Sequence, residues 1–475
     1  MAPPRIRASK TLVAVAAIAA ALPLALSGTA AADPVPDPPA QPVEVPVRPA
    51  LPFPQLPLPP GFDPDFYRPA PETYRDKQPG DIIAARQVNL ANLSLLPVNI
   101  DAWQLSYRSS DSRGEPIAAV ATVMKPRGHV ADRPLFSYQI AEDSTGNYCM
   151  PSYQLQMGSV PAPITGSLLV PAQFLEVQAA LAQGWAAVVP DHQGPDSAYA
   201  AGPLAAHITL DGIRAAQRFA PMELPGTATR VGLMGYSGGA IATGHAAESQ
   251  ADYAPELNVV GAAYGGVPAD LGAALRLANG NLSSGLILAA VLGLSREYPQ
   301  LANFLERHMN PLGRGLLAIK DQLCASYQSY LLPFANNLGM LDADPFQDPG
   351  VLDVLGATRM GRAIPEMPLF LYQANMDWLI PVGPVDDLVD TYCADPNASV
   401  DYTRDHFSEH LTLDPIAAPR ALLWLKDRFA GVPASPGCRT TDVGSMTLDP
   451  VTWQIWGETV GTTLAAAFGQ PIGSR

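Results

Sequence analysis

From about residue 100 onward, short runs of β-branched and other apolar residues alternate with segments that have the apolar spacing of helices. The expected strands are residues 118–124, 134–140, 185–190, 231–235, 259–264, 367–373 and 399–403. The expected helices are residues 174–184, 209–219, 240–249 and 416–429. Strands that alternate with helices predict a mostly parallel sheet with right-handed crossovers. Because the strands are almost continuously apolar, the sequence predicts an α/β fold with helices on both faces of its sheet.

A long segment between the expected strands 259–264 and 367–373 has no clear strand pattern. Residues 270–330 instead carry apolar side chains at helical spacing. The segment is too long for an ordinary connection between two elements of an α/β fold. We therefore expect a helical cap, about residues 266–345, inserted into the connectivity of the sheet. The alternative is an extra packing layer with no role in a functional site.

The start of the chain has the pattern of a secretory signal peptide. Its positive charges are Arg5, Arg7 and Lys10. An apolar stretch, residues 11–26, follows them, and a run of three alanines ends at Ala32. We expect residues 1–32 to be removed by cleavage after Ala32 and the mature protein to be extracellular. A membrane anchor is the alternative, but the apolar stretch is short for a span and lacks a stop-transfer pattern.

Residues 33–60 contain 12 prolines in 28 positions. Such a composition favours extended polyproline II structure and cannot form a core of its own. We expect this segment to be a spacer, with a ligand for a proline-recognising module as the alternative. Residues 61–475 would then form the α/β domain with its cap, and no later segment is apolar enough to predict an integral membrane segment.

The charge balance of the chain excludes some classes of partner. Its 44 acidic and 29 basic residues give a formal net charge of -15, and only 15% of its residues are charged. An acidic protein is not attracted to the phosphates of nucleic acids, nor by charge alone to anionic lipid surfaces. The hydrophobic content of 48% excludes a disordered chain and permits a large core.

The four cysteines indicate disulfides rather than a metal site. Their positions are Cys149, Cys324, Cys393 and Cys438. An even number in an exported chain favours two disulfides, and four cysteines allow three connectivities. The spacing lacks a C-x-x-C pair, which argues against zinc or redox chemistry. We prefer 149–324, which would tie the early chain to the helical insertion, and 393–438, which closes a short loop. Four free buried thiols are the alternative.

The strongest candidate for chemistry is Ser237, in the pattern G-x-S-x-G between the expected strand 231–235 and helix 240–249. A nucleophilic serine at such a junction occupies a sharp, strained turn that lifts its hydroxyl above the sheet. Glycines at 235 and 239 remove side chains that would clash there. The start of the following helix offers free N–H groups to developing negative charge. An ordinary glycine-rich turn is the alternative.

A serine nucleophile needs a base, since its hydroxyl is weakly nucleophilic at its own pKa. In enzymes built on this turn, the chain order is serine, then an acid, then histidine. Of the seven histidines, only His406 and His410 come late enough to follow both the serine and an acid. Both lie just after the last expected strand, where a loop could carry a base over the serine.

The acid of such a set is best matched by Asp377. It follows an apolar strand, in a loop of the kind that holds a carboxylate against an imidazole. Asp390 and Asp405 are rival candidates. Metal ligands and cofactors are not needed for this chemistry, and none is expected.

With these residues in place, the chain resembles the secretory lipase family of fungi and actinobacteria, the lipase A type of α/β-hydrolase. The resemblance covers most of the chain after about residue 60. It is carried by 138–139, 142–144, 149–153, Asp191 with 194–195, 210–216, 235–240, and Asp377 with 380–381.

The resemblance implies roles for several residues. Ser237, Asp377 and a late histidine would form a catalytic triad, and the local pattern at 408–410 is similar to actinobacterial members, which favours His410. Gly238 would supply one N–H of the oxyanion hole, and Asp143 would match an acidic oxyanion residue of the family. An acid can act there through its backbone N–H, or as a protonated carboxyl. The family also implies a cap with a lid and a disulfide that fits the 149–324 pair.

The expected function is therefore that of a secreted serine hydrolase of carboxylic esters, with acylglycerols as the favoured substrates and transient contact with a lipid interface. A short-chain carboxylesterase is the nearest alternative. An acyltransferase on envelope lipids would use the same residues with a different acceptor. A secreted binding protein without catalytic activity, built on the same fold, is the remaining alternative.

Overall fold

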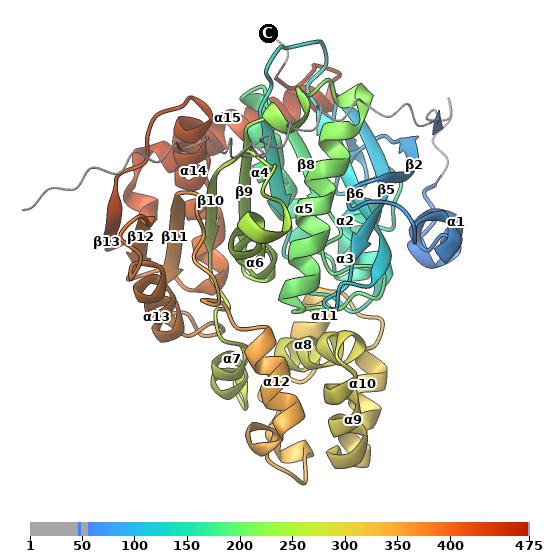
Figure 1. Ribbon diagram of the computed structural model, residues 1–475, viewed down its shortest axis with the longest axis vertical. Helices are drawn as coiled ribbons and strands as arrows, with labels where there is room; N and C mark the ends of the chain where they lie inside the picture. Colours follow the sequence, from blue (N-terminus) through green and yellow to red (C-terminus); the bar gives the residue numbers. More distant parts are fainter. Residues whose placement is uncertain (1–45, 49–55, 474–475) are drawn as a thin grey trace, which may run out of the picture. The chain divides into compact units, whose positions relative to one another are not determined.

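The computed structural model describes residues 46–48 and 56–473, and the architecture is that of a large sheet with helices on both faces (Figure 1). The expected signal segment 1–32, the cleavage after Ala32 and most of the spacer 33–60 lie outside the described residues. The 11-stranded sheet has the order β1-β2-β5-β6-β8-β7-β9-β10-β11-β12-β13. In that order the strands are β1 (Val47–Arg48), β2 (Ile82–Gln87), β5 (Asp101–Ser110), β6 (Pro116–Lys125), β8 (Ala186–Pro190), β7 (Leu135–Gln139), β9 (Val231–Tyr236), β10 (Val259–Gly265), β11 (Leu369–Ala374), β12 (Ser399–Asp405) and β13 (Gly437–Val443).

Three neighbouring pairs towards one edge, β2–β5, β5–β6 and β6–β8, are antiparallel, and the other pairs are parallel. Because β7, β9, β11 and β12 run in the same direction, the loops that follow them meet at one end of the sheet. Ligands of such sheets bind in the crevice outside the carboxyl ends of the strands. The topology therefore brings together loops that are far apart in the sequence.

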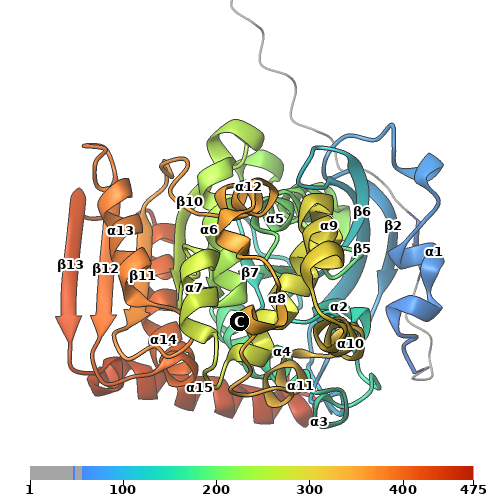
Figure 2. The same ribbon diagram turned by 90° about the horizontal axis from the view of Figure 1, so that it is seen from below.

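Two hydrophobic clusters explain why the strands are apolar on both faces. Successive side chains of a strand point to opposite faces, so Leu233 belongs to one cluster and Met234 to the other. The first cluster includes residues of α5 (Gly202–Arg218), α6 (Gly238–Tyr253) and α13 (Val382–Tyr392). The second includes residues of α4 (Leu169–Ala182), α14 (His410–Phe429) and α15 (Pro450–Ala467). Figure 2 shows α5, α6 and α13 on one face and α14 and α15 on the other.

The helical insertion leaves the sheet after β10 and returns at β11. Its helices are α7 (Leu271–Ala278), α8 (Ser284–Glu297), α9 (Pro299–His308), α10 (Pro311–Lys320), α11 (Ala325–Tyr330) and α12 (Pro349–Ala357). They form a layer beyond the carboxyl end of the sheet, at the bottom of Figure 1. The layer continues past residue 345, because Asp348 caps α12 by accepting a hydrogen bond from Val351 N–H. The predicted α/β fold with an inserted helical cap is confirmed.

The structure also contains two disulfides. Cys149 is bonded to Cys324 and Cys393 to Cys438, with Cα–Cα distances of 5.5 and 6.0 Å. These are the two pairs preferred from the sequence. The first joins the loop after β7 to the start of α11 in the cap, and the second joins the end of α13 to the edge strand β13. Within residues 46–48 and 56–473, no helix is long and apolar enough to cross a membrane.

Candidate active site

Ser237 occupies the turn between β9 and α6 with φ 54° and ψ -118°, a conformation that non-glycine residues rarely adopt. A Cβ on Gly235 would lie 2.4 Å from Thr243 Oγ1, and one on Gly239 would lie 1.9 Å from Gln139 O. Both positions therefore require glycine. Ser237 N–H donates to Gly265 O at 2.9 Å, which holds the turn against β10. Such strain costs about 1–3 kcal/mol and persists only where the surroundings determine it.

His410, the first residue of α14, is buried beside the serine. Its Nε2 lies 2.8 Å from Ser237 Oγ, and its Nδ1 lies 2.6 Å from Asp377 Oδ2. Glu409 caps the helix that begins with this histidine, accepting hydrogen bonds from the N–H groups of Leu411 and Thr412. The imidazole thus connects a hydroxyl to a carboxylate, and its position is fixed by a helix terminus.

Asp377 follows β11 and its carboxylate is fully occupied. Oδ1 accepts hydrogen bonds from Leu379 N–H at 2.9 Å and Ile380 N–H at 2.7 Å. Oδ2 accepts one from Gln373 Nε2 at 3.1 Å in addition to its contact with His410. A carboxylate held in this way can orient an imidazole and can stabilise its protonated form.

The electrostatic environment of His410 favours its protonated form. Burial lowers its pKa, but Asp377, Asp143 and Asp414 act in the opposite direction, and the net result is a pKa above the ordinary value of 6.5. A histidine with a raised pKa is a stronger base, and in its neutral form it can accept a proton. A hydroxyl, imidazole and carboxylate in this order can perform nucleophilic attack on a carbonyl carbon.

The alternative candidates for the base and the acid lie outside this arrangement of Ser237, His410 and Asp377. His406 is on the surface, with Nε2 at 2.8 Å from Asp442 Oδ1 and Nδ1 at 2.8 Å from Asn375 Nδ2. Asp390 is exposed on α13. Asp405 is buried but accepts hydrogen bonds from the N–H groups of residues 407, 408 and 446, so that it shapes the loop before His410.

Gly238 and Asp143 meet beside the serine. Gly238 begins α6, so its N–H belongs to the helix N-terminus. Asp143 is buried in the loop after β7 with φ 46°, and a Cβ on Gly238 would lie only 1.6 Å from Asp143 Oδ1. Burial raises the pKa of Asp143 to about 7, although His410 and Tyr199 lower it. Asp143 Oδ1 has no hydrogen-bond partner among the described residues.

Several residues that support this arrangement were not expected from the sequence. Trp378 Nε1 donates to Glu409 Oε2 at 2.7 Å, and Gln173 Oε1 accepts from Ala141 N–H at 2.7 Å. The local sequence around Trp378 and Gln173 does not indicate such a role, because both side chains contact segments that are distant in the sequence. Among the residues that the structure describes, no group of three or more His, Cys, Asp or Glu side chains is placed to hold a metal ion.

The fold and this site define an α/β-hydrolase. Comparison with known proteins gives the family: the sequence matches the secretory lipase family over residues 159–437, and the chain belongs to that family. As a member of this family, the chain belongs among the secreted hydrolases of carboxylic esters.

Two relatives and one solved structure show how far the similarity extends. Lipase A of Arthroderma benhamiae is 35% identical over 88% of this chain and 90% of its own length. A protein of Mycobacterium tuberculosis named a probable inactive lipase is 39% identical over 86% of this chain and 89% of its own. The crystal structure of Candida antarctica lipase A has a TM-score of 0.77 and 29% identity, covering 88% of this chain and 99% of that one.

Proposed function

We propose that this protein is an exported serine hydrolase that cleaves acylglycerols through Ser237, His410 and Asp377. One observation carries the proposal: the unbroken series of contacts from Ser237 Oγ to His410 Nε2 and from His410 Nδ1 to Asp377 Oδ2, at 2.8 and 2.6 Å. Export rests on the signal pattern of residues 1–32, with cleavage after Ala32.

The reaction follows from the positions of these groups. Ser237 Oγ attacks the ester carbonyl carbon while His410 Nε2 takes its proton, and Asp377 stabilises the imidazolium. The tetrahedral intermediate collapses to an acyl-enzyme as His410 returns the proton to the alcohol that leaves. Water, activated by the same imidazole, then attacks the acyl group and releases the fatty acid.

The oxyanion is stabilised by the backbone N–H groups of Gly238 and Asp143. Removing one such donor typically lowers turnover by about 10²–10³-fold. A carboxylate beside the oxyanion would oppose this effect, but a pKa raised to about 7 leaves the Asp143 carboxyl partly protonated at neutral pH. The protein can therefore use an acid here without placing a full negative charge against the intermediate.

Preference for acylglycerols is supported by apolar side chains exposed on the cap. They include Leu312, Ile319, Tyr330 and Phe334. Large apolar side chains exposed on an exported protein suit contact with a lipid surface. A hydrolase of small soluble esters has no need of such a surface.

The first test is labelling with a fluorophosphonate probe. The folded wild-type protein should be labelled at Ser237, and Ser237→Ala should not be labelled. Absence of labelling in the folded wild type would contradict the proposal and leave a binding protein without catalytic activity.

The second test separates ester substrates by chain length. Emulsified long-chain triacylglycerols should be hydrolysed, with a rise in rate above their solubility limit. Activity confined to acetyl and butyryl esters would identify a short-chain carboxylesterase. Transfer of the acyl group to added glycerol or sugar, in preference to water, would identify an acyltransferase.

A further inference from the structure

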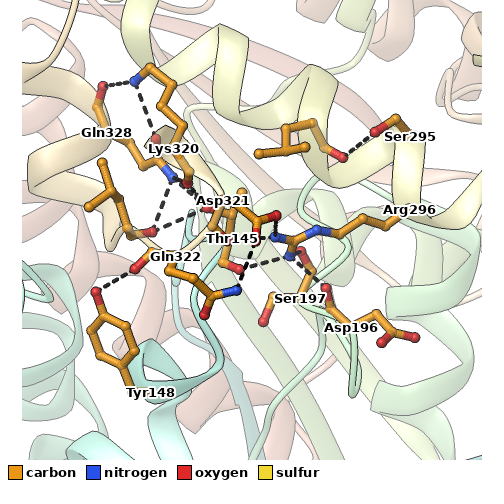
Figure 3. A network of polar contacts seen from close by, with 12 residues as sticks. Thr145, Tyr148, Asp196, Ser197, Ser295, Arg296, Lys320, Asp321, Gln322 and Gln328 are labelled. Carbon is orange, nitrogen blue, oxygen red and sulfur yellow. Dashed lines mark hydrogen bonds and ion pairs between the residues drawn. The ribbon is translucent and has the colours of Figure 1, made fainter. Parts of the chain in front are cut away.

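We propose that helix α8 of the cap positions the oxyanion loop, defined here as residues 141–145, and that Arg296 is the positioning residue. This inference rests on the proposed function, because it assigns a role to groups outside the triad in the same reaction. Figure 3 shows the network in which the Arg296 side chain extends from α8 towards Thr145, Asp196, Ser197 and Asp321.

Two strained loops enclose the Asp143 carboxyl. Asp143 itself has φ 46°, and in the loop of residues 194–201 Ser197 has φ 49° and Ala200 has φ 71°. Tyr199, from that second loop, lies beside the Asp143 carboxyl. Left-handed conformations at non-glycine residues persist only when their surroundings hold them. The position of the Asp143 N–H therefore depends on whatever restrains these two loops.

Arg296 restrains both of them at once. Its Nη1 donates to Thr145 O at 2.7 Å, to Asp196 O at 2.6 Å and to Ser197 O at 3.0 Å. Its Nη2 donates to Asp321 O at 2.7 Å and to Asp321 Oδ1 at 2.9 Å. The planar guanidinium presents several donors in a fixed geometry, which an ammonium group cannot reproduce. One side chain of the cap thus holds the oxyanion loop and the loop of Tyr199.

The backbone of α8 is also close to the second loop. A Cβ on Gly293, one turn before Arg296, would lie 2.4 Å from Tyr199 N and 2.6 Å from Tyr199 O. Glycine is needed at this position because the helix contacts the loop backbone directly. Position 293 therefore offers a second, independent way to disturb the same loop.

A buried cluster in the cap completes the restraint of the oxyanion loop at Thr145. Thr145 N–H donates to Leu323 O at 3.1 Å, its hydroxyl donates to Lys320 O at 2.5 Å, and Gln328 Nε2 donates to Thr145 Oγ1 at 2.5 Å. Lys320 Nζ in turn donates to Gln328 O at 2.8 Å. All the hydrogen-bonding groups of Thr145 are thus occupied by the cap, two positions from Asp143.

The test compares Arg296→Ala, Arg296→Lys and Gly293→Ala with two matched controls on the cap. Arg307→Ala removes an exposed arginine of α9 whose Nε donates to Asn303 O within its own helix. Gly315→Ala adds a Cβ to α10 that would meet no described atom within 4 Å apart from its chain neighbours and the backbone of its own helix. Steady-state kinetics on a soluble ester and inhibition by phenylboronic acid are measured for each. The boronate adduct of a serine imitates the tetrahedral intermediate.

We expect Arg296→Ala and Gly293→Ala to lower kcat on the order of 10²-fold with KM within twofold, since a small misplacement of a catalytic group costs about that much. The inhibition constant of phenylboronic acid should rise by the same factor as kcat/KM falls. Arg296→Lys should recover part of the loss. If the Arg296 and Gly293 variants match their controls, or if KM rises while kcat is unchanged, the inference is wrong.

Hydrogen–deuterium exchange of the same variants separates this inference from the proposed function. Peptides covering residues 141–149 and 194–201 should exchange faster in Arg296→Ala than in the wild type. In Arg307→Ala their exchange rates should equal those of the wild type. Faster exchange in a protein whose wild type has no esterase activity would contradict only the proposed function. Unchanged exchange in an active enzyme would contradict only the positioning role of α8.

Discussion

Trp378 donates a hydrogen bond from its indole Nε1 to the carboxylate of Glu409 at 2.7 Å. Trp378 follows Asp377 in the sequence, and Glu409 precedes His410. The two residues that flank the contact between Asp377 and His410 are therefore hydrogen-bonded to each other, which links the loop after β11 to the start of α14. The geometry between carboxylate and imidazole is maintained by this neighbouring contact as well as by their own.

Loss of the indole donor should loosen the site without removing any group that reacts. We expect Trp378→Phe to lower kcat several-fold, and Glu409→Ala, which also removes a helix cap, to lower the free energy of unfolding by about 1 kcal/mol. Trp453→Phe, at an exposed tryptophan of α15, is the control. Equal kcat values in the Trp378 and Trp453 variants would show that the contact does not affect the triad.

The two late histidines should respond very differently to replacement. His410→Ala removes the proposed base and should lower kcat/KM by about 10⁴-fold or more, leaving only the residual rate supplied by binding and the oxyanion hole. His406→Ala disturbs only contacts with Asp442 and Asn375 at the surface and should retain nearly full activity. Hydrolysis rates of a p-nitrophenyl ester measure the activity of both variants. A large loss in His406→Ala with little loss in His410→Ala would assign the base to His406 instead.

The pH dependence of the reaction should reflect the raised pKa of His410. A base must be neutral to act, so kcat/KM should fall as the pH drops through this pKa, at a pH above the ordinary 6.5. Asp377→Asn removes one of the charges that raise it, while Asp143 and Asp414 remain. The acid limb of the profile should then move to lower pH and kcat should fall by about 10⁴-fold. An acid limb that stays in place in Asp377→Asn would contradict this assignment.

Position 238 should tolerate no side chain. Gly238→Ala would place a Cβ 1.6 Å from Asp143 Oδ1, so either the oxyanion loop or the start of α6 must shift. We expect turnover to fall by about 10²-fold or more. Gly457→Ala in α15 adds a Cβ that would meet no described atom within 4 Å apart from its chain neighbours and the backbone of its own helix, so it should keep full activity and raise stability by about 0.5–1 kcal/mol. Thermal melts and ester hydrolysis of both variants check this.

Ser237 could be predicted because the turn that it occupies is local. Glycines at 235 and 239, a strand before and a helix after are all visible in a short stretch of sequence. The choice between His406 and His410, in contrast, cannot be made from a short stretch of sequence. Both residues follow β12 closely, and which of them faces inward depends on how Asp405 bonds the loop between them.

Elements with weak patterns were missed for a physical reason. Strand β13 is exposed along almost its whole length, so it lacks the apolar residues that identify a buried strand. Arg296 was missed because four of its five acceptors are backbone carbonyl groups of distant segments. Every residue has a carbonyl group, so no residue type at those positions indicates the contact.

The bond between Cys149 and Cys324 joins the beginning of α11 to the core a few residues after the oxyanion loop. Their Cα atoms are 5.5 Å apart, and a disulfide does not allow them to separate much further. The cap is thus attached covalently to the core four residues beyond the oxyanion loop. Whatever else the cap does, the start of α11 therefore keeps its distance from the segment that follows the oxyanion loop.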